Sequence, residues 1–326
     1  MKIVVQKFGG TSVSTKERRE KVVKKIKNAI DEGFSPVVVV SAMGRSGDPY
    51  ATDTLLSLVG DKFKNSNKLA TDLLMCCGEI ISAVVMSNEL FDAGIDAVPL
   101  TGGQAGIKTD NVFTNAKHLN VDPKQILDFV AKGRVPVITG FQGMTEDGFF
   151  TTLGRGGSDT SAAILGVALQ AEQIEIYTDV DGIMTADPRI VKDASLINVI
   201  SYNEVFQLAE QGAKVIHPRA VEIAMAAKVP IRIRSTYSDG LGTLVTSLHQ
   251  QSRGSDINDN LVTGIAHMSN ISQIRVNAKK DQYDFQTEIF KAMANESISV
   301  DFINISPNGV VYTVNDEMTE TAIAAL

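Results

Sequence analysis

Cysteine and histidine are scarce in this sequence of 326 residues, which contains two cysteines and four histidines. The cysteines, Cys76 and Cys77, are adjacent, and neighbouring cysteines rarely form a disulfide with each other. Neither this pair nor the scattered histidines have the spacing of a metal site. We therefore expect that the cysteines pack in the core, that no disulfide framework exists, and that the chain resides in a reducing cytoplasm.

Long apolar runs and clusters of positive charge are also lacking. No run approaches the ~18 apolar residues of a membrane-spanning helix, and the N-terminus, MKIVVQKFGG, lacks the apolar core and cleavage site of a signal peptide. The net charge of -7, without a Lys/Arg-rich patch, disfavours nucleic acid as a partner. The composition, 44% hydrophobic, fits a soluble chain with a large core and about two domains.

Short segments rich in Val and Ile alternate with longer helical segments over the first 250 residues. This alternation predicts an α/β fold with a mainly parallel sheet sandwiched by helices. Ser14 and Glu17 form an S-x-x-E pattern, which predicts a capping box before an apolar helical stripe that ends at Gly33. The predicted strands are 2–6, 36–42, 96–100, 136–141, 149–153, 174–178 and 229–235, and the predicted helices lie near 67–93, 123–132, 158–170 and 202–227.

The polar segment QQSRGSDINDN, from 250 to 260, predicts a linker between two domains. Beyond it the pattern is typical of an α+β βαββαβ module that lacks its closing strand. We expect a large domain over 1–250, a linker over 251–260 and a partial small module over 261–326. The expected elements of this module are strands 272–277, 298–305 and 309–314, helix 283–295 and a last helical segment.

Four glycine-rich turns follow predicted strands. Ligands of open α/β sheets bind at the carboxyl ends of strands, and glycine lets backbone N–H groups approach phosphate, so four turns at one sheet edge predict a phosphate site. A single such turn would more simply be a tight turn. Neither a P-loop nor a G-x-G-x-x-G motif is present. The turns are KFGGTS (7–12), MGRSG (43–47), GGQAG (102–106) and LGRGGSD (153–159).

Six segments, taken in order, resemble the aspartate kinases of the amino-acid kinase family. The resemblance implies transfer of the γ-phosphoryl group of ATP to the β-carboxylate of L-aspartate, which gives 4-phospho-L-aspartate on the route to lysine, threonine and methionine. The tail resembles the start of paired regulatory ACT domains, which implies lysine or threonine as an effector and a homo-oligomer. The segments are KFGGTS (7–12), VVVVSAMG (37–44), GE (78–79), TTLGRGGSD (151–159), YTDVDGIMTADPR (177–189) and GAKVIHPRA (212–220).

Three charged residues are candidates for catalysis. A carboxylate nucleophile is already ionised at pH 7, so the reaction needs positive charge and positioning more than a base. Lys7 is expected to reach the phosphates, although a solvated lysine at a strand end explains it equally from sequence alone. Lys214, which the resemblance puts near ATP, is otherwise a helix-surface charge. Asp159 is expected to hold both lysines in place, and this is compatible with a capping role in the following helix.

Arg155 and Glu79 are candidates for binding the acceptor. The planar fork of an arginine grips a carboxylate with two parallel hydrogen bonds, which suits the α-carboxylate of an amino acid. Glu79 lies in the apolar segment MCCGEIISAVV, where a carboxylate is costly unless it is paired, and a substrate ammonium group is a natural partner. A solvated loop arginine and an internal salt bridge are the simpler explanations. With the resemblance, the expected acceptor site comprises Ser41, Glu79, Arg155, Gly156, Gly157 and Ser158.

The nucleotide is expected, by resemblance, along the segment from Thr178 to Arg189. Met184 departs from the family pattern, because many relatives carry a tyrosine there that could stack on the nucleotide. No acidic cluster suggests a metal cage, so Mg²⁺ is expected mainly on the ATP phosphates and water. The expected ATP-binding residues are Lys7, Phe8, Gly9, Gly10, Thr178, Asp179, Met184, Asp187, Arg189, Lys214 and Val215.

Two other functions fit parts of the pattern. An acetylglutamate, glutamate or UMP kinase would share the fold, but acetylation removes the ammonium group that Glu79 would bind. A catalytically silent amino-acid sensor would depend on the tail, but Lys7, Asp159 and Lys214 are retained together. Because the residues of a second ACT domain are absent from this sequence, we expect lysine or threonine to inhibit weakly or not at all.

Overall fold

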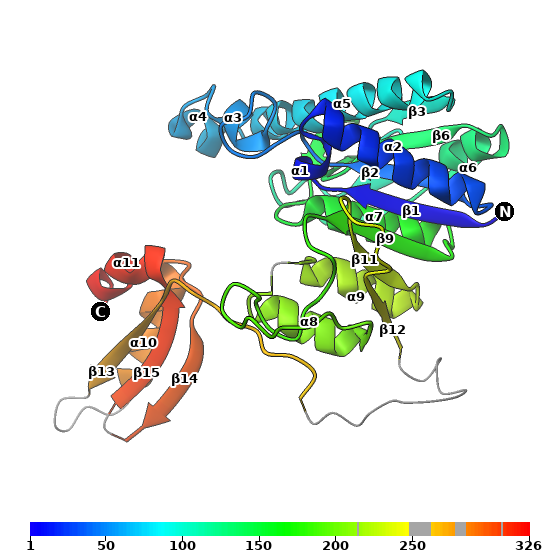
Figure 1. The fold of residues 1–326 in the computed structure, drawn as a ribbon. Helices are drawn as coiled ribbons and strands as arrows, with labels where there is room; N and C mark the ends of the chain where they lie inside the picture. Colours follow the sequence, from blue (N-terminus) through cyan, green and yellow to red (C-terminus); the bar gives the residue numbers. More distant parts are fainter. Residues whose placement is uncertain (214, 248–261, 278–284, 308) are drawn as a thin grey trace. The chain divides into compact units, whose positions relative to one another are not determined.

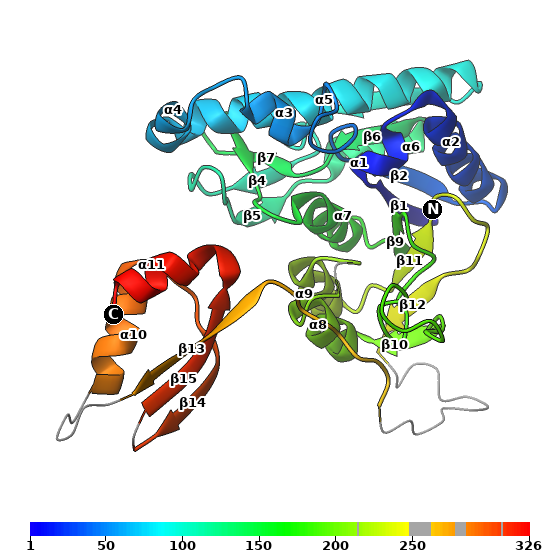
Figure 2. The same cartoon turned by 60° about the vertical axis from the view of Figure 1, so that its left-hand side comes forward.

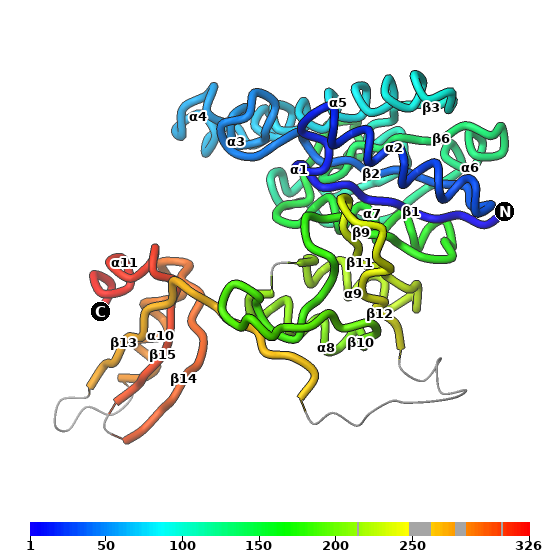
Figure 3. The backbone as a smooth tube through the Cα atoms, in the orientation of Figure 1, coloured from blue at the N-terminus to red at the C-terminus, as the bar shows by residue number. Residues whose placement is uncertain are grey.

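The computed structural model describes residues 1–213, 215–247, 262–277, 285–307 and 309–326 (Figure 1). These residues form two compact units, Met1–Ala266 and His267–Leu326. The expected linker 251–260 lies outside the described residues. Figure 3 traces the backbone of each unit from the N-terminus to the C-terminus.

The first unit is built on an eight-stranded sheet in the order β10-β12-β11-β9-β1-β2-β6-β3. All neighbouring strands are parallel except β11 and β12, so the predicted α/β fold with a mainly parallel sheet is confirmed. The strands are β1 (Ile3–Phe8), β2 (Ser35–Val40), β3 (Ala97–Leu100), β6 (Val135–Thr139), β9 (Gln173–Thr178), β10 (Val199–Ser201), β11 (Ile231–Ser235) and β12 (Thr243–Thr246).

Helices cover both faces of this sheet because its central strands are apolar on both faces (Figures 1 and 2). Alternate residues of a strand point to opposite faces. Ile3 and Val5 belong to a core with α6, α7, α8 and α9, whereas Phe8 belongs to a second core with α2 and α5. These helices are α2 (Lys16–Asp31), α5 (Lys68–Asp92), α6 (Lys124–Ala131), α7 (Gly157–Ala168), α8 (Tyr202–Glu210) and α9 (Pro218–Ala227).

A second, four-stranded sheet has the order β5-β4-β7-β8 and contains β4 (Ile107–Thr109), β5 (His118–Val121), β7 (Gln142–Met144) and β8 (Phe150–Thr152). The predicted strand 149–153 is β8, which pairs antiparallel with β7 and does not join the parallel sheet. The glycine turn 153–159 therefore starts from this smaller sheet. The expectation that all four glycine turns lie at the edge of one sheet was wrong for this turn.

Two helix predictions were wrong in detail. The N-cap of α2 is Thr15, whose side chain accepts a hydrogen bond from the Arg18 N–H, whereas the Ser14 hydroxyl donates to the Thr11 carbonyl. The predicted helix 202–227 is two helices, α8 and α9, because Pro218 at the first position of α9 favours a helix start. The sequence patterns also missed the short helices α1 (Gly10–Val13), α3 (Thr52–Leu56) and α4 (Asp61–Ser66).

The second unit is a small α+β module with strand order β13-β15-β14, and both pairs of strands are antiparallel. The described residues of its core include nine that are buried, among them Phe285, Val310 and Tyr312. The predicted order of strand, helix, strand, strand and helix is confirmed. The elements are β13 (Ile271–Asn277), α10 (Phe285–Asn295), β14 (Asp301–Ser306), β15 (Gly309–Asn315), a short 3₁₀ turn (Asp316–Met318) and α11 (Thr319–Ala324).

Candidate active site

One cavity of about 340 Å³ lies where β1 and β2 end and the glycine turn before α7 approaches them. It contains every residue expected in the acceptor site. It also contains the predicted catalytic residues Lys7 and Asp159. The expected residues that line it are Lys7, Gly10, Ser41, Glu79, Arg155, Gly156, Gly157, Ser158 and Asp159.

Lys7 and Asp159 form an ion pair with 2.7 Å between Nζ and Oδ1, and each side chain is 13% exposed. Lys7 points to the α7 face of the sheet because it shares the alternation of Ile3 and Val5 in β1. Asp159 lies in the first turn of α7, and its Oδ2 accepts a hydrogen bond of 3.2 Å from the His217 main-chain N–H. Lys214, the second expected cation, lies outside the described residues.

Glu79 is 2% exposed and lies in the middle of α5. Its Oε1 accepts a hydrogen bond of 3.1 Å from the Ala42 N–H, while Oε2 has no hydrogen-bond partner among the described residues. Desolvation by burial raises the pKa of Glu79 to about 8, although the Ala42 N–H lowers it. The carboxyl group of Glu79 is thus held at the cavity wall, with one oxygen that contacts no polar group of the described chain.

Glycine allows α5 to approach the loop after β2. A Cβ added to Gly78 would lie 2.9 Å from the Ala42 Cβ and 3.1 Å from the Tyr50 carbonyl oxygen. Real Cβ atoms rarely come this close, so a larger residue would push the helix away. Gly78 therefore fixes the distance between Glu79 and its donor at Ala42.

The turn that carries Arg155 has left-handed backbone at Gly154 (φ 75°) and Gly156 (φ 67°), which favours glycine at both positions. The Leu153 N–H donates to the Phe141 carbonyl over 2.8 Å, and the Gly157 N–H donates to the Gly154 carbonyl over 3.0 Å. Arg155 is exposed and has no hydrogen-bond or ion-pair partner within the part of the chain that the structure describes. Its guanidinium is available to an anion in the cavity.

The turn after β1 is packed too tightly for side chains. A Cβ added to Gly10 would lie 2.5 Å from the Ala42 carbonyl oxygen and 2.7 Å from that of Gly44. The Gly9 N–H donates to the Tyr177 carbonyl over 3.4 Å. Phe8 is fully buried and stacks on Tyr177 with 4.7 Å between ring centroids, so only its main chain can reach a ligand at this turn.

The expected nucleotide residues after β9 do not line the cavity. Thr178 ends β9, and the next residue, Asp179, forms an ion pair of 2.8 Å with Arg45 of the turn after β2. Met184 forms an antiparallel bridge with Leu196.

The three remaining described members of the expected nucleotide set, Asp187, Arg189 and Val215, also lie outside this cavity. Asp187 forms an ion pair of 2.7 Å with Arg189. Val215 is partly buried against the core of the α7 face. The structure therefore groups the acceptor residues around one cavity, whereas the described nucleotide residues from β9 onward lie outside it.

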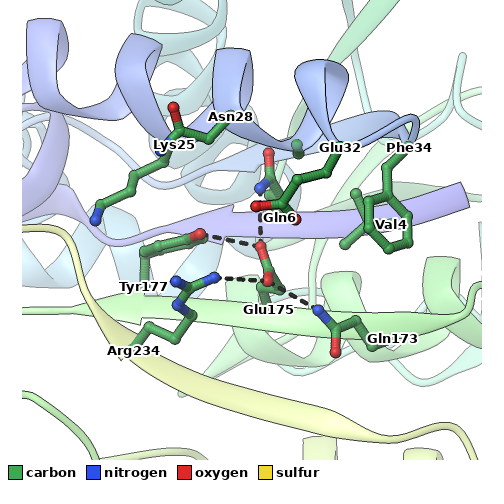
Figure 4. Close-up of a pocket in the computed structure, with 11 residues that line it drawn as sticks. Val4, Gln6, Lys25, Asn28, Glu32, Phe34, Gln173, Glu175, Tyr177 and Arg234 are labelled. Atoms are coloured by element: carbon green, nitrogen blue, oxygen red, sulfur yellow. Dashed lines mark hydrogen bonds and ion pairs between the residues drawn. The ribbon is translucent and has the colours of Figure 1, made fainter. Parts of the chain in front are cut away.

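A polar cluster on the face of β1 and β9 opposite Lys7 was not predicted (Figure 4). The Glu175 carboxylate, 4% exposed, accepts hydrogen bonds from Gln6 (2.8 Å), Gln173 (2.9 Å), Tyr177 (3.0 Å) and Arg234 (3.1 Å). The adjoining cavity measures only about 40 Å³. We infer that this cluster fixes β1 against β9, since a buried carboxylate with four donors resists displacement. Polar residues inside otherwise apolar strands were the signal for it.

Nine further lining residues were not assigned to the site, and Arg45, Thr52, Asp53 and Phe141 are among them. Arg45 lies in the glycine turn 43–47, which the sequence did single out, but no residue of that turn was assigned to the site. Phe141 has a positive φ of 70°, which no sequence signal indicated.

Comparison with known proteins identifies the family. The family model named Amino acid kinase family matches residues 2–235. Aspartokinase 1 of Bacillus subtilis is 57% identical, over 99% of this chain and 80% of its own length. The chain belongs to the aspartokinases. The aspartokinase of Geobacillus stearothermophilus is 42% identical, over 93% of this chain and 72% of its own length.

Solved aspartokinase structures share the fold. Escherichia coli aspartokinase III in complex with aspartate and ADP (R-state) has a TM-score of 0.75 and 26% identity, and the match covers 96% of this chain and 79% of that one. The same enzyme in complex with lysine and aspartate (T-state) has a TM-score of 0.79 and 26% identity, covering 99% and 83%. The predicted resemblance to aspartate kinases is confirmed.

Helix α5 is a core helix of this aspartokinase fold. It is long and apolar enough to cross a membrane by length and composition, with a mean hydropathy of 1.8 over an 18-residue window. Half of that window is buried inside the protein, and the helix supplies Glu79 to the cavity.

Among the described residues, no group of three or more His, Cys, Asp or Glu side chains could hold a metal ion.

Proposed function

We propose that this chain transfers the γ-phosphoryl group of ATP to the β-carboxylate of L-aspartate. The observation that carries the proposal is the meeting, in one cavity, of the Lys7–Asp159 ion pair with Glu79 and Arg155. The unpartnered Oε2 of Glu79 fits the α-ammonium group of an amino acid, and the free fork of Arg155 fits its α-carboxylate. The 57% identity to an aspartokinase supports aspartate as this amino acid.

In this reaction, an oxygen of the β-carboxylate attacks the γ-phosphorus, the bond from that phosphorus to the β–γ bridging oxygen breaks, and ADP leaves. The protein supplies positioning and charge, because the nucleophile is already ionised. Lys7 stabilises the negative charge that develops on the phosphoryl oxygens and the leaving phosphate. Asp159 keeps the Lys7 ammonium group in place, so little reorganisation is needed when the bond breaks.

Mg²⁺ is proposed as the cofactor that ATP brings with it. The scarcity of acidic clusters within the described residues fits an ion coordinated mainly by phosphate oxygens and water. The main-chain N–H group of Gly10 and the side chain of Lys7 are the proposed phosphate contacts, because the Gly9 N–H already donates to the Tyr177 carbonyl. The segment from Thr178 to Arg189, with Val215 and Lys214, is the proposed site of the nucleoside.

The large domain is proposed as the catalytic part and the small module as the regulatory part. Lysine is bound in one related aspartokinase structure, which makes it the first effector to test, with threonine as the second. A homo-oligomer in the cytoplasm is proposed on the same family grounds.

The decisive experiment traps the acyl phosphate with hydroxylamine while the acceptor is varied. Aspartate should give the hydroxamate, whereas glutamate and acetylglutamate should not, and UMP should give no additional ADP. Turnover with another acceptor would assign a different kinase of this fold. Binding of amino acids without any turnover would favour a catalytically silent sensor.

A further inference from the structure

His217 contacts two residues of the proposed site, Gly156 and Asp159, without lining the cavity. It is the N-cap residue of α9, and its Nδ1 accepts a hydrogen bond of 3.3 Å from the Arg219 main-chain N–H. Its own main-chain N–H donates to Oδ2 of Asp159, the residue whose other oxygen pairs with Lys7. The segment GAKVIHPRA contributed only Lys214 and Val215 to the expected site, so His217 had no assigned role.

The imidazole ring of His217 lies directly against the main chain of Gly156. A Cβ added to Gly156 would be 2.1 Å from Cγ and 2.2 Å from Cδ2 of the ring. Contacts this short mean that the ring occupies the space which any side chain at this position would need. The left-handed backbone that follows Arg155 therefore rests on an aromatic surface.

The start of α9 also contacts the beginning of the glycine turn that carries Arg155. Nη1 of Arg219 donates a hydrogen bond of 3.1 Å to the Leu153 carbonyl oxygen. The residues before and after Arg155 are thus both fixed by side chains from the start of α9. Arg155 itself has no partner in the described chain, so its position depends on these supports.

The hydrogen bond to Nδ1 requires an unprotonated nitrogen, which places the proton of the neutral ring on Nε2. Burial lowers the pKa of His217, and Arg219 lowers it further, while Asp159 opposes the shift. A neutral ring adds no charge beside the Lys7–Asp159 ion pair.

We propose that His217 is a positioning residue for the acceptor site: its ring supports Gly156 and thereby sets where Arg155 meets the carboxylate of the amino acid. The inference rests on the proposed function. It assigns to His217 an effect on acceptor binding and no contact with either substrate.

Two substitutions of His217 distinguish the contribution of its ring from that of its N-cap hydrogen bond. His217→Phe keeps an aromatic ring but loses the N-cap acceptor, so we expect KM for aspartate within about threefold of wild type and a Tm lower by a few degrees. His217→Asn keeps the acceptor but loses the ring, so we expect KM for aspartate to rise about tenfold with Tm nearly unchanged. KM for ATP should stay within about twofold in both.

A double-substitution cycle tests the contact itself. Gly156→Ala should raise KM for aspartate at least tenfold, and combining it with His217→Gly, which also removes the His217 Cβ that would lie 2.4 Å from the added methyl group, should raise KM far less than the product of the two single effects. Independent effects would overturn the proposal. The proposal would also be overturned if KM for aspartate rose in His217→Phe, whose Tm falls, and not in His217→Asn. The rise in KM would then come from loss of the N-cap hydrogen bond and not from loss of the ring.

Hydrogen exchange tests the inference separately from the reaction. The Gly157 amide, hydrogen-bonded to the Gly154 carbonyl, should exchange faster in His217→Asn than in His217→Phe. Equal rates would overturn the proposed support. A wild-type protein that phosphorylates no aspartate would refute the proposed function alone, because this exchange measurement needs no turnover.

Discussion

Glu79 shows how burial sets the chemistry of one residue. Its pKa near 8 means that the empty site holds mainly the neutral acid at pH 7, whereas an ammonium group is bound by the ionised form. Binding of aspartate must then be accompanied by loss of a proton from Glu79. The cost of this ionisation falls as pH rises and disappears above the pKa.

We therefore predict that the affinity for aspartate increases with pH by up to about tenfold per unit below pH 8 and levels off above it. Titration calorimetry at pH 6 to 9 measures this directly. Glu79→Gln should flatten the profile. A wild-type affinity that does not vary over this range would contradict the role of Glu79 as the partner of the ammonium group.

Glu79→Gln and Arg155→Lys are predicted to raise KM for aspartate by about tenfold or more and to leave KM for ATP within about twofold. Each side chain should contact only the acceptor, and lysine keeps the charge of arginine but loses its fork. Asp92→Asn, at the exposed end of the same helix as Glu79, is the matched control and should change neither KM. An equal rise in both KM values would show that the acceptor site is assigned wrongly.

Lys7→Ala is predicted to lower kcat by ~10²–10³ with much smaller changes in either KM, because its charge matters most as the β–γ bond breaks. Lys2→Ala, an exposed lysine just before the same strand, should retain wild-type kcat. Steady-state kinetics with saturating aspartate and ATP checks this. A decrease below threefold would remove Lys7 from the catalytic step.

The charged residues of the site could be predicted individually because their types are unusual where they stand. Arg155 lies among glycines and Glu79 among apolar residues, and both line the cavity. The contacts around the site could not be predicted, since the Arg45–Asp179 pair and the contact of His217 with Gly156 join residues far apart in the chain. Only the fold brings such residues together.

At the scale of single elements, long apolar segments were predictable and short ones were not. Helix α5 was predicted within about one residue at each end, because its 25 residues repeat the apolar pattern of a helix over many turns. Of the four strands of the second sheet only β8 was predicted; β4, β5 and β7 have three or four residues each, too few to display a period of two. The N-cap of α2 was misplaced because Ser14 and Thr15 are both good caps, and tertiary contacts selected between them.

The close approach of α5 to the loop after β2 gives a prediction for Gly78→Ala. Alanine favours helix by about 1 kcal/mol, but the added Cβ would meet the Ala42 Cβ at 2.9 Å. We expect overpacking to dominate, lowering stability by about 1–3 kcal/mol and raising KM for aspartate as Glu79 moves. Gly240→Ala, in an open position, is the control for both Tm and KM. A more stable variant with unchanged KM would show that the loop yields easily.

At the scale of the whole molecule, the alternation of apolar strands and helices predicted the class of fold but not the strand order. The antiparallel β11–β12 pair and the separate second sheet depend on pairings between distant segments. The small module was predicted element by element, because each of its elements follows its own local pattern.

The two units are predicted to differ in local stability. The core of the small module, as far as the structure describes it, has nine buried residues, and all six residues of its strand β14 are exposed. Amides of β14 and β15 should therefore exchange with solvent faster than amides of β1 and β2 in the intact chain. Hydrogen exchange followed by mass spectrometry compares them in one sample. Slower exchange in β14 than in β1 would contradict the prediction.

The ion pair between Arg45 and Asp179 crosses the end of β1, which lies between β2 and β9 in the sheet. Arg45 is 71% exposed and Asp179 is 45% exposed, and pairs of this kind are worth at most about 1 kcal/mol. A free energy of about 1 kcal/mol in favour of the ion pair corresponds to about five molecules with the pair formed for each molecule with it broken. Roughly one molecule in six, or more, therefore has the pair broken at any moment. The pair therefore orders the two loops without limiting how often a substrate can enter between them.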